Sequence, residues 1–174
     1  MKITKAALHY HFAGKAELGE ALIARYAARF AEALAEVEER TDEASARLDA
    51  YADLYLDVLR EHRMCLCGMM AAEYETLPPP MQDAVVRFFE ENERWLARVL
   101  EQGRGAGSLS FTGPPEEAAG MIVSGLEGAM LVARPFDDIA RFQSAARQLL
   151  SGVKPSSGNH APTRSRSKAT AIRS

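Results

Sequence analysis

Cysteine and long hydrophobic runs are both scarce in this sequence. Its 174 residues include only two cysteines, Cys65 and Cys67, which are too few for a disulfide framework and poorly spaced for bonding each other within a helix. The N-terminus lacks the continuous apolar segment of a secretory signal. The most hydrophobic stretch, residues 118–133, is too short to span a bilayer and contains Glu127. These absences predict a cytoplasmic protein without a membrane partner.

Catalytic and cofactor motifs are missing as well. The sequence has no recognisable nucleophile and base set and no carboxylate pair in a cleft. The glycine-rich segment GRGAGS, residues 103–108, follows a helical pattern and not a strand, so it is a flexible loop and not a nucleotide fingerprint. We therefore expect no enzymatic activity and no cofactor.

The two cysteines raise the alternative of a soft-metal site, because thiolate and thioether ligands select soft ions. The nearby candidates are His62, Met64, Met69 and Met70. No third cysteine or histidine lies in helical register with the pair, and one histidine does not complete a tetrahedral set. We therefore expect the two cysteines and the nearby methionines to pack in the core or to line a pocket, and we expect no bound metal.

The pattern of apolar residues predicts an all-α fold, because they recur at steps of three and four along almost the whole chain. No segment has the alternation of a strand. The expected helices cover about residues 16–40, 67–75, 116–134 and 137–152, and apolar stripes at 48–59 and 81–100 mark two more, the first capped by Thr41 or Asp42 and the second ending in the loop 103–108.

The helix expected at 116–134 differs from the others because only Ser124 and Glu127 are clearly polar between residues 118 and 133. A helix that is apolar on nearly every face must be buried on nearly every face. This helix and the last one, at 137–152, together have more apolar surface than one subunit can cover. They predict a two-fold dimer packed as a four-helix bundle, and the alternative is a helix central to its own subunit. The expected interface residues are Ile122, Leu126, Met130, Phe142 and Leu149.

Aromatic and sulfur side chains at helical spacing indicate either a ligand pocket or plain core. Glu127, isolated in its apolar helix, contacts a ligand or a dimer partner, or pairs with Arg134 or Arg98. The pocket residues we predict are Tyr51, Tyr55, Cys65, Met69, Phe88, Trp95, Met121 and Glu127.

Charge is distributed unevenly, although the net charge is only −3. The first 30 residues carry five basic and two acidic side chains, and residues 154–174 carry five basic side chains and no acid. The composition from residue 153 onward predicts a disordered basic tail.

The basic N-terminus contains the segment ITKAALHYHFAGKAEL, from Ile3 to Leu18. Thr4 is a good N-cap for a helix from Lys5 to about Tyr10, so a hydroxyl and a cation lie at its exposed end. Such groups contact phosphates and base edges when the second helix of a helix-turn-helix enters the major groove. Lys15 starts the next helix, where free backbone N–H groups favour an anion.

This segment resembles the recognition helix and the start of the following helix in the TetR family of bacterial transcriptional regulators, whose pattern is roughly V-S-K-G-T-L-Y-Y-H-F-x-S-K-E-x-L. Ile3, Leu8 and Phe12 match its apolar positions, and His9 and Ala6 are mild departures from its tyrosine and glycine. The stretch LEGAMLVAR, residues 126–134, looks like the family's dimerising penultimate helix.

The resemblance implies a ligand-responsive repressor that binds operator DNA as a homodimer and is released by a small-molecule effector. The DNA-binding residues it implies are Thr4, Lys5, Ala6, His9, Tyr10, His11 and Lys15. The implied domains are a partial helix-turn-helix at 1–17, a helical effector-binding and dimerisation domain at 18–152 and the tail at 153–174.

Family members carry two helices before the recognition helix, and the printed sequence has none there. We therefore expect either a coding region that starts further upstream or a true truncation. The truncated alternative is a dimeric helical ligand-binding or interaction protein without competent DNA binding.

Overall fold

A computed structural model of the chain describes residue 12 and residues 14–155. These residues form helices and connecting loops with no β-strand, which confirms the predicted all-α class. The helices are α2 (Lys15–Arg40), α3 (Ala44–Arg60), α4 (Leu66–Ala72), α5 (Pro79–Gly105), α6 (Pro115–Ala133) and α7 (Ile139–Ser151), with short 3₁₀ helices η1 (Tyr74–Thr76) and η2 (Arg134–Phe136). None of the described helices is long and apolar enough to cross a membrane.

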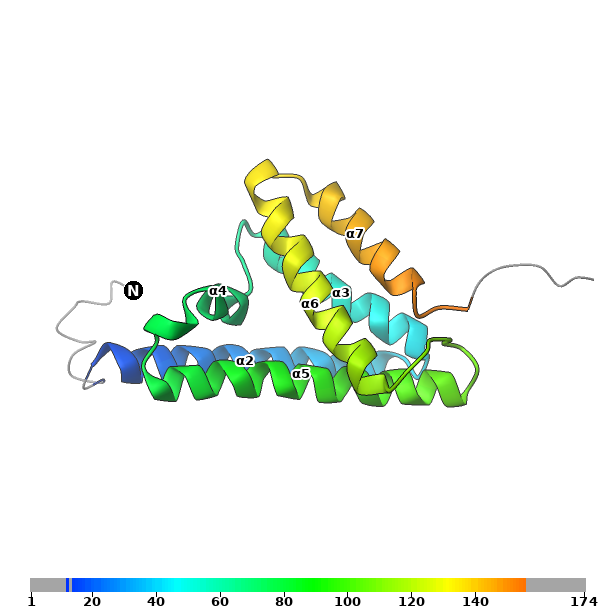
Figure 1. The fold of residues 1–174 in the computed structure, drawn as a ribbon, viewed down its shortest axis with the longest axis horizontal. Helices are drawn as coiled ribbons and strands as arrows, with labels where there is room; N and C mark the ends of the chain where they lie inside the picture. Colours follow the sequence, from blue (N-terminus) through cyan, green and yellow to red (C-terminus); the bar gives the residue numbers. More distant parts are fainter. Residues whose placement is uncertain (1–11, 13, 156–174) are drawn as a thin grey trace, which may run out of the picture.

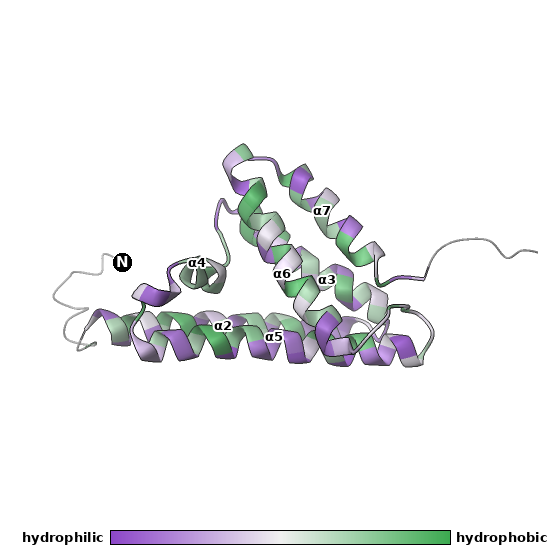
Figure 2. Ribbon diagram, in the orientation of Figure 1, coloured by the Kyte–Doolittle hydropathy of each residue, from purple (hydrophilic) through white to green (hydrophobic). Residues whose placement is uncertain are grey.

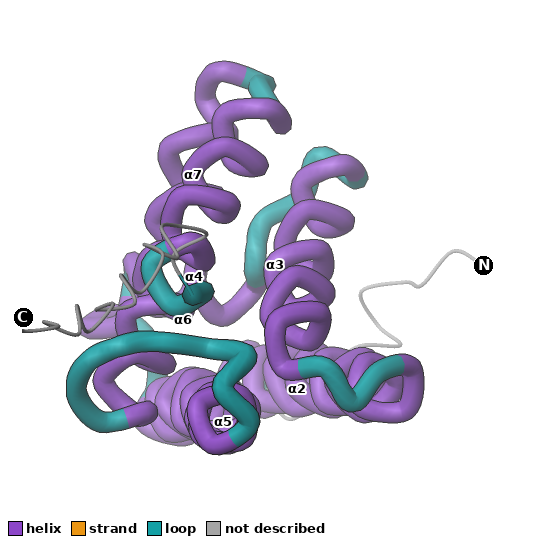
Figure 3. The backbone as a smooth tube through the Cα atoms, turned by 90° about the vertical axis from the view of Figure 1, so that its right-hand side faces the viewer, coloured by secondary structure: helices purple, strands orange, loops and turns teal. Residues whose placement is uncertain are grey.

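The helices form two layers (Figures 1 and 3). The long helices α2 and α5 lie side by side and run in the same direction, as the contact between Phe30 and Phe88 and the ion pair between Glu38 and Arg98 further along both show. Helices α3, α6 and α7 form the second layer, and α4 lies near the N-terminal part of α2. The core lies between the layers.

Local sequence explains the helix boundaries. Pro79 and Pro115 occupy the first turns of α5 and α6, where a missing N–H costs nothing, and Asp138 caps α7 by accepting a hydrogen bond from the Arg141 N–H at 3.2 Å. The expected helix at 67–75 divides into α4 and η1.

Helix α6 is apolar along most of its length (Figure 2) but is buried on one side only. Its inner face packs in the core, whereas Met121, Leu131 and Val132 are 67%, 58% and 54% exposed. The alternative of a helix enclosed on every side by its own subunit is therefore wrong. Gly125 brings α7 close, because a Cβ there would lie 2.5 Å from Leu149 Cδ2.

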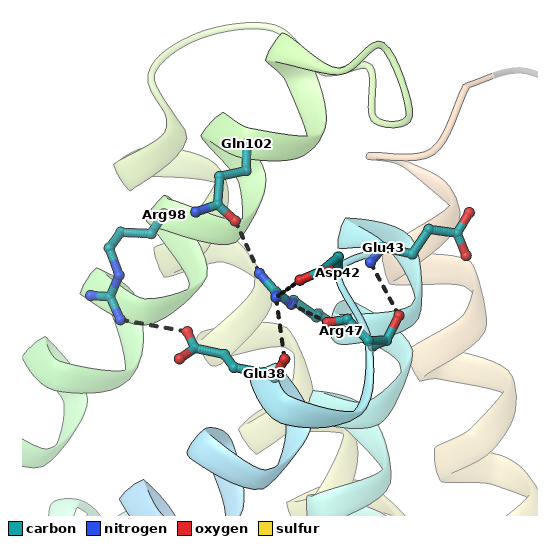
Figure 4. A network of polar contacts seen from close by, with 7 residues as sticks. Glu38, Asp42, Glu43, Arg47, Arg98 and Gln102 are labelled. Atoms are coloured by element: carbon teal, nitrogen blue, oxygen red, sulfur yellow. Dashed lines mark hydrogen bonds and ion pairs between the residues drawn. The ribbon is translucent and has the colours of Figure 1, made fainter.

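Buried Arg47 of α3 joins the α2–α3 turn to α5 (Figure 4). Its guanidinium donates to the Thr41 carbonyl oxygen at 2.7 Å and to Gln102 Oε1 at 3.0 Å. It also lies 3.2 Å from Asp42 Oδ1. The planar group thus satisfies partners in the α2–α3 turn and on α5, which fixes the C-terminal end of α2 against the body.

The first residues of the predicted tail, Val153 and Lys154, pack against the helical body. The Ser110 N–H donates to the Val153 carbonyl oxygen at 2.9 Å, Val153 is buried, and Lys154 Nζ lies 2.7 Å from Asp49 Oδ1. Residues 153–155 therefore belong to the described body. Residues 156–174 lie outside the described part of the chain.

Candidate functional site

Of the seven predicted DNA-binding residues, the structure describes only Lys15. Lys15 is exposed at the first position of α2, after Gly14 as N-cap. Gly14 supplies no side-chain cap, so the first N–H groups of this helix have no side-chain acceptor there. Residues outside the description are Thr4, Lys5, Ala6, His9, Tyr10 and His11.

Six of the eight predicted pocket residues lie around one buried aromatic cluster: Tyr51 and Tyr55 on α3, Cys65 before α4, Phe88 and Trp95 on α5, and Glu127 on α6. Helix α2 adds Tyr26 and Phe30. The Phe30 ring meets those of Tyr51, Tyr55 and Phe88 edge-on, at centroid distances of 5.9, 6.1 and 5.4 Å. Edge-to-face rings at these distances attract one another beyond simple burial. The cluster therefore joins four helices and the approach to α4.

Polar groups form a chain through this cluster. The Tyr51 hydroxyl donates to Asn92 Oδ1 at 3.2 Å and lies 3.3 Å from the Tyr55 hydroxyl. Asn92 Nδ2 donates to the Phe88 carbonyl oxygen at 2.7 Å. The Trp95 ring stacks on Tyr51, yet its buried Nε1 has no hydrogen-bond partner among the residues that the structure describes. A buried donor without an acceptor carries a desolvation penalty that a ligand oxygen would relieve.

Glu127 occupies the α6 side of the cluster, next to α4. Its carboxyl group interacts with the Cys65 thiol and the Tyr55 hydroxyl, but burial outweighs both and raises the pKa of Glu127. Oε1 is buried and has no hydrogen-bond partner within the described part of the chain. Of the two cations suggested by the sequence, Arg98 pairs with Glu38, and neither it nor Arg134 forms an ion pair with Glu127. The acid is therefore desolvated and lacks a counter-charge among the described residues.

The two cysteines are buried and carry neutral thiols. Burial raises the pKa of Cys65 to about 12 and that of Cys67 well above its usual range. The Cys65 N–H donates to Met130 Sδ at 3.2 Å, and the Gly68 N–H donates to Cys65 Sγ at 3.4 Å. Across the described residues, no three His, Cys, Asp or Glu side chains are grouped so that they could hold a metal ion.

The other two predicted pocket residues lie elsewhere. Met69 and Met121 are 47% and 67% exposed, so neither lines the buried cluster. Asn92 was missed by the sequence reasoning, although one signal could have found it. It is a polar residue four positions after Phe88 and three before Trp95, which is a core position of α5.

A groove of about 380 Å³ between α2 and α5 borders the cluster. Phe30, Phe88, Asn92 and Trp95 belong to both the groove and the cluster. A larger and more open hollow of about 910 Å³ lies along α5 and the start of α6. Its lining is mostly charged side chains and contains none of the aromatic rings of the cluster, so the smaller groove is the more relevant space.

The residues predicted for the dimer interface lie mostly inside the single subunit. Ile122, Leu126, Met130 and Phe142 are at most 1% exposed, and Leu149 is half-buried against Gly125. A side chain that its own subunit covers completely has no surface left for a partner. Any interface on α6 must therefore use the exposed neighbours of these residues.

Comparisons with known proteins agree with this architecture. The family described as "Tetracyclin repressor-like, C-terminal domain" matches residues 44–149. A solved TetR family transcriptional regulator from Agrobacterium tumefaciens is 30% identical, with 87% of this chain and 81% of that chain covered at a TM-score of 0.83. No curated protein sequence matches the chain.

Two further solved structures have the same fold. A regulatory protein TetR from Rhodobacter sphaeroides is 26% identical (87% of this chain, 82% of that chain, TM-score 0.79). A TetR transcriptional regulator from Legionella pneumophila is 28% identical (87% and 81%, TM-score 0.77). The family match covers more than half of the sequence, and it agrees with the helical body described above. The chain belongs to the TetR family of transcriptional regulators.

Proposed function

We propose that this protein is a ligand-responsive repressor that binds operator DNA as a homodimer. The observation that carries the proposal is the position of α2. This helix begins at Lys15, directly after the segment that resembles a recognition helix, and Tyr26 and Phe30 further along it belong to the buried cluster. One rigid helix therefore connects the expected DNA contact to the expected effector site.

The cluster supports an effector because it has unmet hydrogen-bonding capacity in an aromatic setting. Trp95 Nε1 and Glu127 Oε1 are the buried side-chain atoms without a partner in the described part of the chain. Native interiors leave few such atoms unpaired, and a ligand is one way to satisfy them. An effector acts only through its different affinity for the DNA-bound and free arrangements of α2.

Homodimer formation is supported by the outer face of α6. Met121, Ser124, Gly128 and Leu131 share this exposed face at helical spacing, and Val132 extends it. The small residues Ser124 and Gly128 would let a second helix approach closely. A two-fold axis beside α6 would pair this face with its own copy, and α6 and α7 would then form a four-helix bundle with their mates.

The direct test is binding of the full chain to the DNA upstream of its own coding region, measured by gel shift over a range of salt concentrations. Repressor function predicts a shift whose affinity falls steeply with salt, because phosphate contacts release counterions. Lys5→Ala should weaken binding and reduce the salt slope by about one, whereas Lys154→Ala, near the C-terminal end of the described residues, should do neither. Absence of any shift at low salt would favour the interaction protein without DNA binding.

A further inference from the structure

Glu127, like Trp95, has a buried polar atom without a hydrogen-bond partner among the described residues, and it is in addition an acid without a counter-charge there. Gly68 lies opposite it on α4, and a Cβ on Gly68 would lie 2.9 Å from Glu127 Cδ. The absence of a side chain at Gly68 therefore leaves room for the carboxyl group. The side chain is half-buried, so part of it remains reachable from the surface although Oε1 is covered.

The surroundings of Glu127 identify what is missing. Among the described residues, its carboxyl group meets a thiol and a phenol but no lysine, arginine or histidine. A carboxylate in such a place is costly unless a cation compensates it. Aromatic rings lie close by, since Tyr55 interacts with the acid directly and Tyr26 interacts with Cys65 beside it. Ring faces attract cations, and the attraction is larger when the cation is desolvated.

A metal ion does not fit this arrangement. Hard divalent cations take six or more oxygen ligands, and zinc takes four nitrogen, sulfur or oxygen ligands. The described residues offer no such group of three or more, and the nearby thiols are neutral because burial raises their pKa. One carboxylate beside aromatic rings is instead suited to an organic cation, whose carbon atoms pack against the rings.

We propose that the effector is an organic monocation, such as a protonated amine, whose charge pairs with the Glu127 carboxylate and whose apolar part packs against the rings of the cluster. This inference rests on the proposed ligand response and names the chemistry of its ligand. Binding at the reachable part of the carboxyl group supplies the counter-charge that the described residues do not provide. Because Tyr26 lies on α2, occupation of this site acts directly on the helix that leads to the DNA.

The test is calorimetric titration of the full chain without DNA, using three ligands of one skeleton: 2-phenylethylamine, 2-phenylethanol and phenylacetate. At pH 7.5 they carry a positive charge, no charge and a negative charge. The amine should bind at least about tenfold more tightly than the alcohol, and phenylacetate should bind least. Equal affinities for amine and alcohol, or tighter binding of phenylacetate, overturn the proposal.

Glu127→Gln keeps the shape of the side chain and removes its charge, so it should reduce the preference for amine over alcohol to less than about threefold. The matched control is Glu93→Gln on α5, a half-buried acid whose removal changes the net charge equally. The control should keep the wild-type preference. If both variants lose it equally, the selectivity comes from the general field of the protein and the assignment to Glu127 fails.

A pH series on the wild type remains informative even if Glu127→Gln does not fold. Burial raises the pKa of Glu127, so affinity for the amine should increase from pH 5 to pH 8 as the carboxyl group loses its proton, whereas affinity for the alcohol should not. The facing groups Tyr26, Tyr51, Tyr55, Cys65 and Cys67 have raised pKa values and stay neutral over this range. An amine affinity that is independent of pH counts against Glu127 as the partner.

Failure of this inference is distinguishable from failure of the proposed function because the titrations contain no DNA. Charge selectivity at Glu127 without any effect on the gel shift would support the site and contradict the ligand response. DNA release by the alcohol as readily as by the amine would support the ligand response and contradict the cation.

Discussion

Gly68 of α4 and Glu127 of α6 are in contact, and the Glu127 carboxyl group fits there because Gly68 has no side chain. A methyl group on Gly68 would overlap the Glu127 carboxyl group. Because Gly68 lies within a helix, the glycine is otherwise unfavourable, by about 0.5–1 kcal/mol relative to alanine. Glycine at position 68 therefore makes α4 less stable than alanine would, but it leaves space for the Glu127 carboxyl group.

This relationship predicts that the effect of Gly68→Ala changes sign with the residue at 127. In the wild type the substitution should destabilise the protein by about 1–3 kcal/mol, because the added methyl group overpacks the site. In a Glu127→Ala background it should stabilise by about 0.5–1 kcal/mol, since only helix propensity remains. Urea unfolding of the four proteins measures this coupling. Additive effects would show that the two residues do not share the space.

Stability should also depend on pH through Glu127. Burial raises its pKa in the folded state, so the folded protein binds more protons than the unfolded chain above the ordinary value of 4.5. Unfolding free energy therefore falls as pH rises from about 4.5 to the raised pKa, and levels off above it. The melting temperature of Glu127→Gln minus that of the wild type should accordingly increase from pH 4.5 to pH 8. A difference that stays constant across this range would contradict the desolvated acid.

Periodicity was enough to predict the helices, because each one buries an apolar stripe at steps of three and four. Helix α2 was expected from about residue 16 to 40 and runs from Lys15 to Arg40. It was harder to predict which side chains of α6 face the core and which face outward. When nearly every position is apolar, the pattern does not distinguish Ile122, which faces the core, from its neighbour Met121, which faces outward.

The candidate site was predictable in part, for a related reason. Aromatic residues on α3 and α5 stood out, and so did the lone Glu127, but the contribution of α2 depends on long-range packing. Tyr26 reaches the cluster only because α2 and α5 run side by side, which periodicity within one helix does not reveal. Gly68 likewise gains its role from Glu127, 59 positions later in the sequence.

Arg47 should be the most sensitive charged position in the described part of the chain. Arg47→Lys keeps the charge but loses the planar fork that reaches both the Thr41 carbonyl oxygen and Gln102, so we expect a loss of about 1.5–3 kcal/mol in unfolding free energy. The control is Arg98→Lys, whose pair with Glu38 is exposed and 3.9 Å long and should matter by less than about 0.5 kcal/mol. The free energy of unfolding of each variant, measured by urea unfolding, tests this difference. Similar small losses at both positions would mean that the Arg47 network does not fix the α2–α3 turn.

Leu131→Glu should separate the proposed homodimer into monomers. The side chain is 58% exposed on the outer face of α6, so a carboxylate there is harmless to a monomer but would be buried against apolar surface at a two-fold interface. Sedimentation equilibrium of the wild type should give a dimer, and the variant should need at least about a hundredfold higher concentration to associate. The matched control, Leu22→Glu, changes a leucine that is 50% exposed on α2 and should leave the dimer intact. If Leu22→Glu dissociates the dimer and Leu131→Glu does not, the interface lies on α2 and the assignment to α6 is wrong.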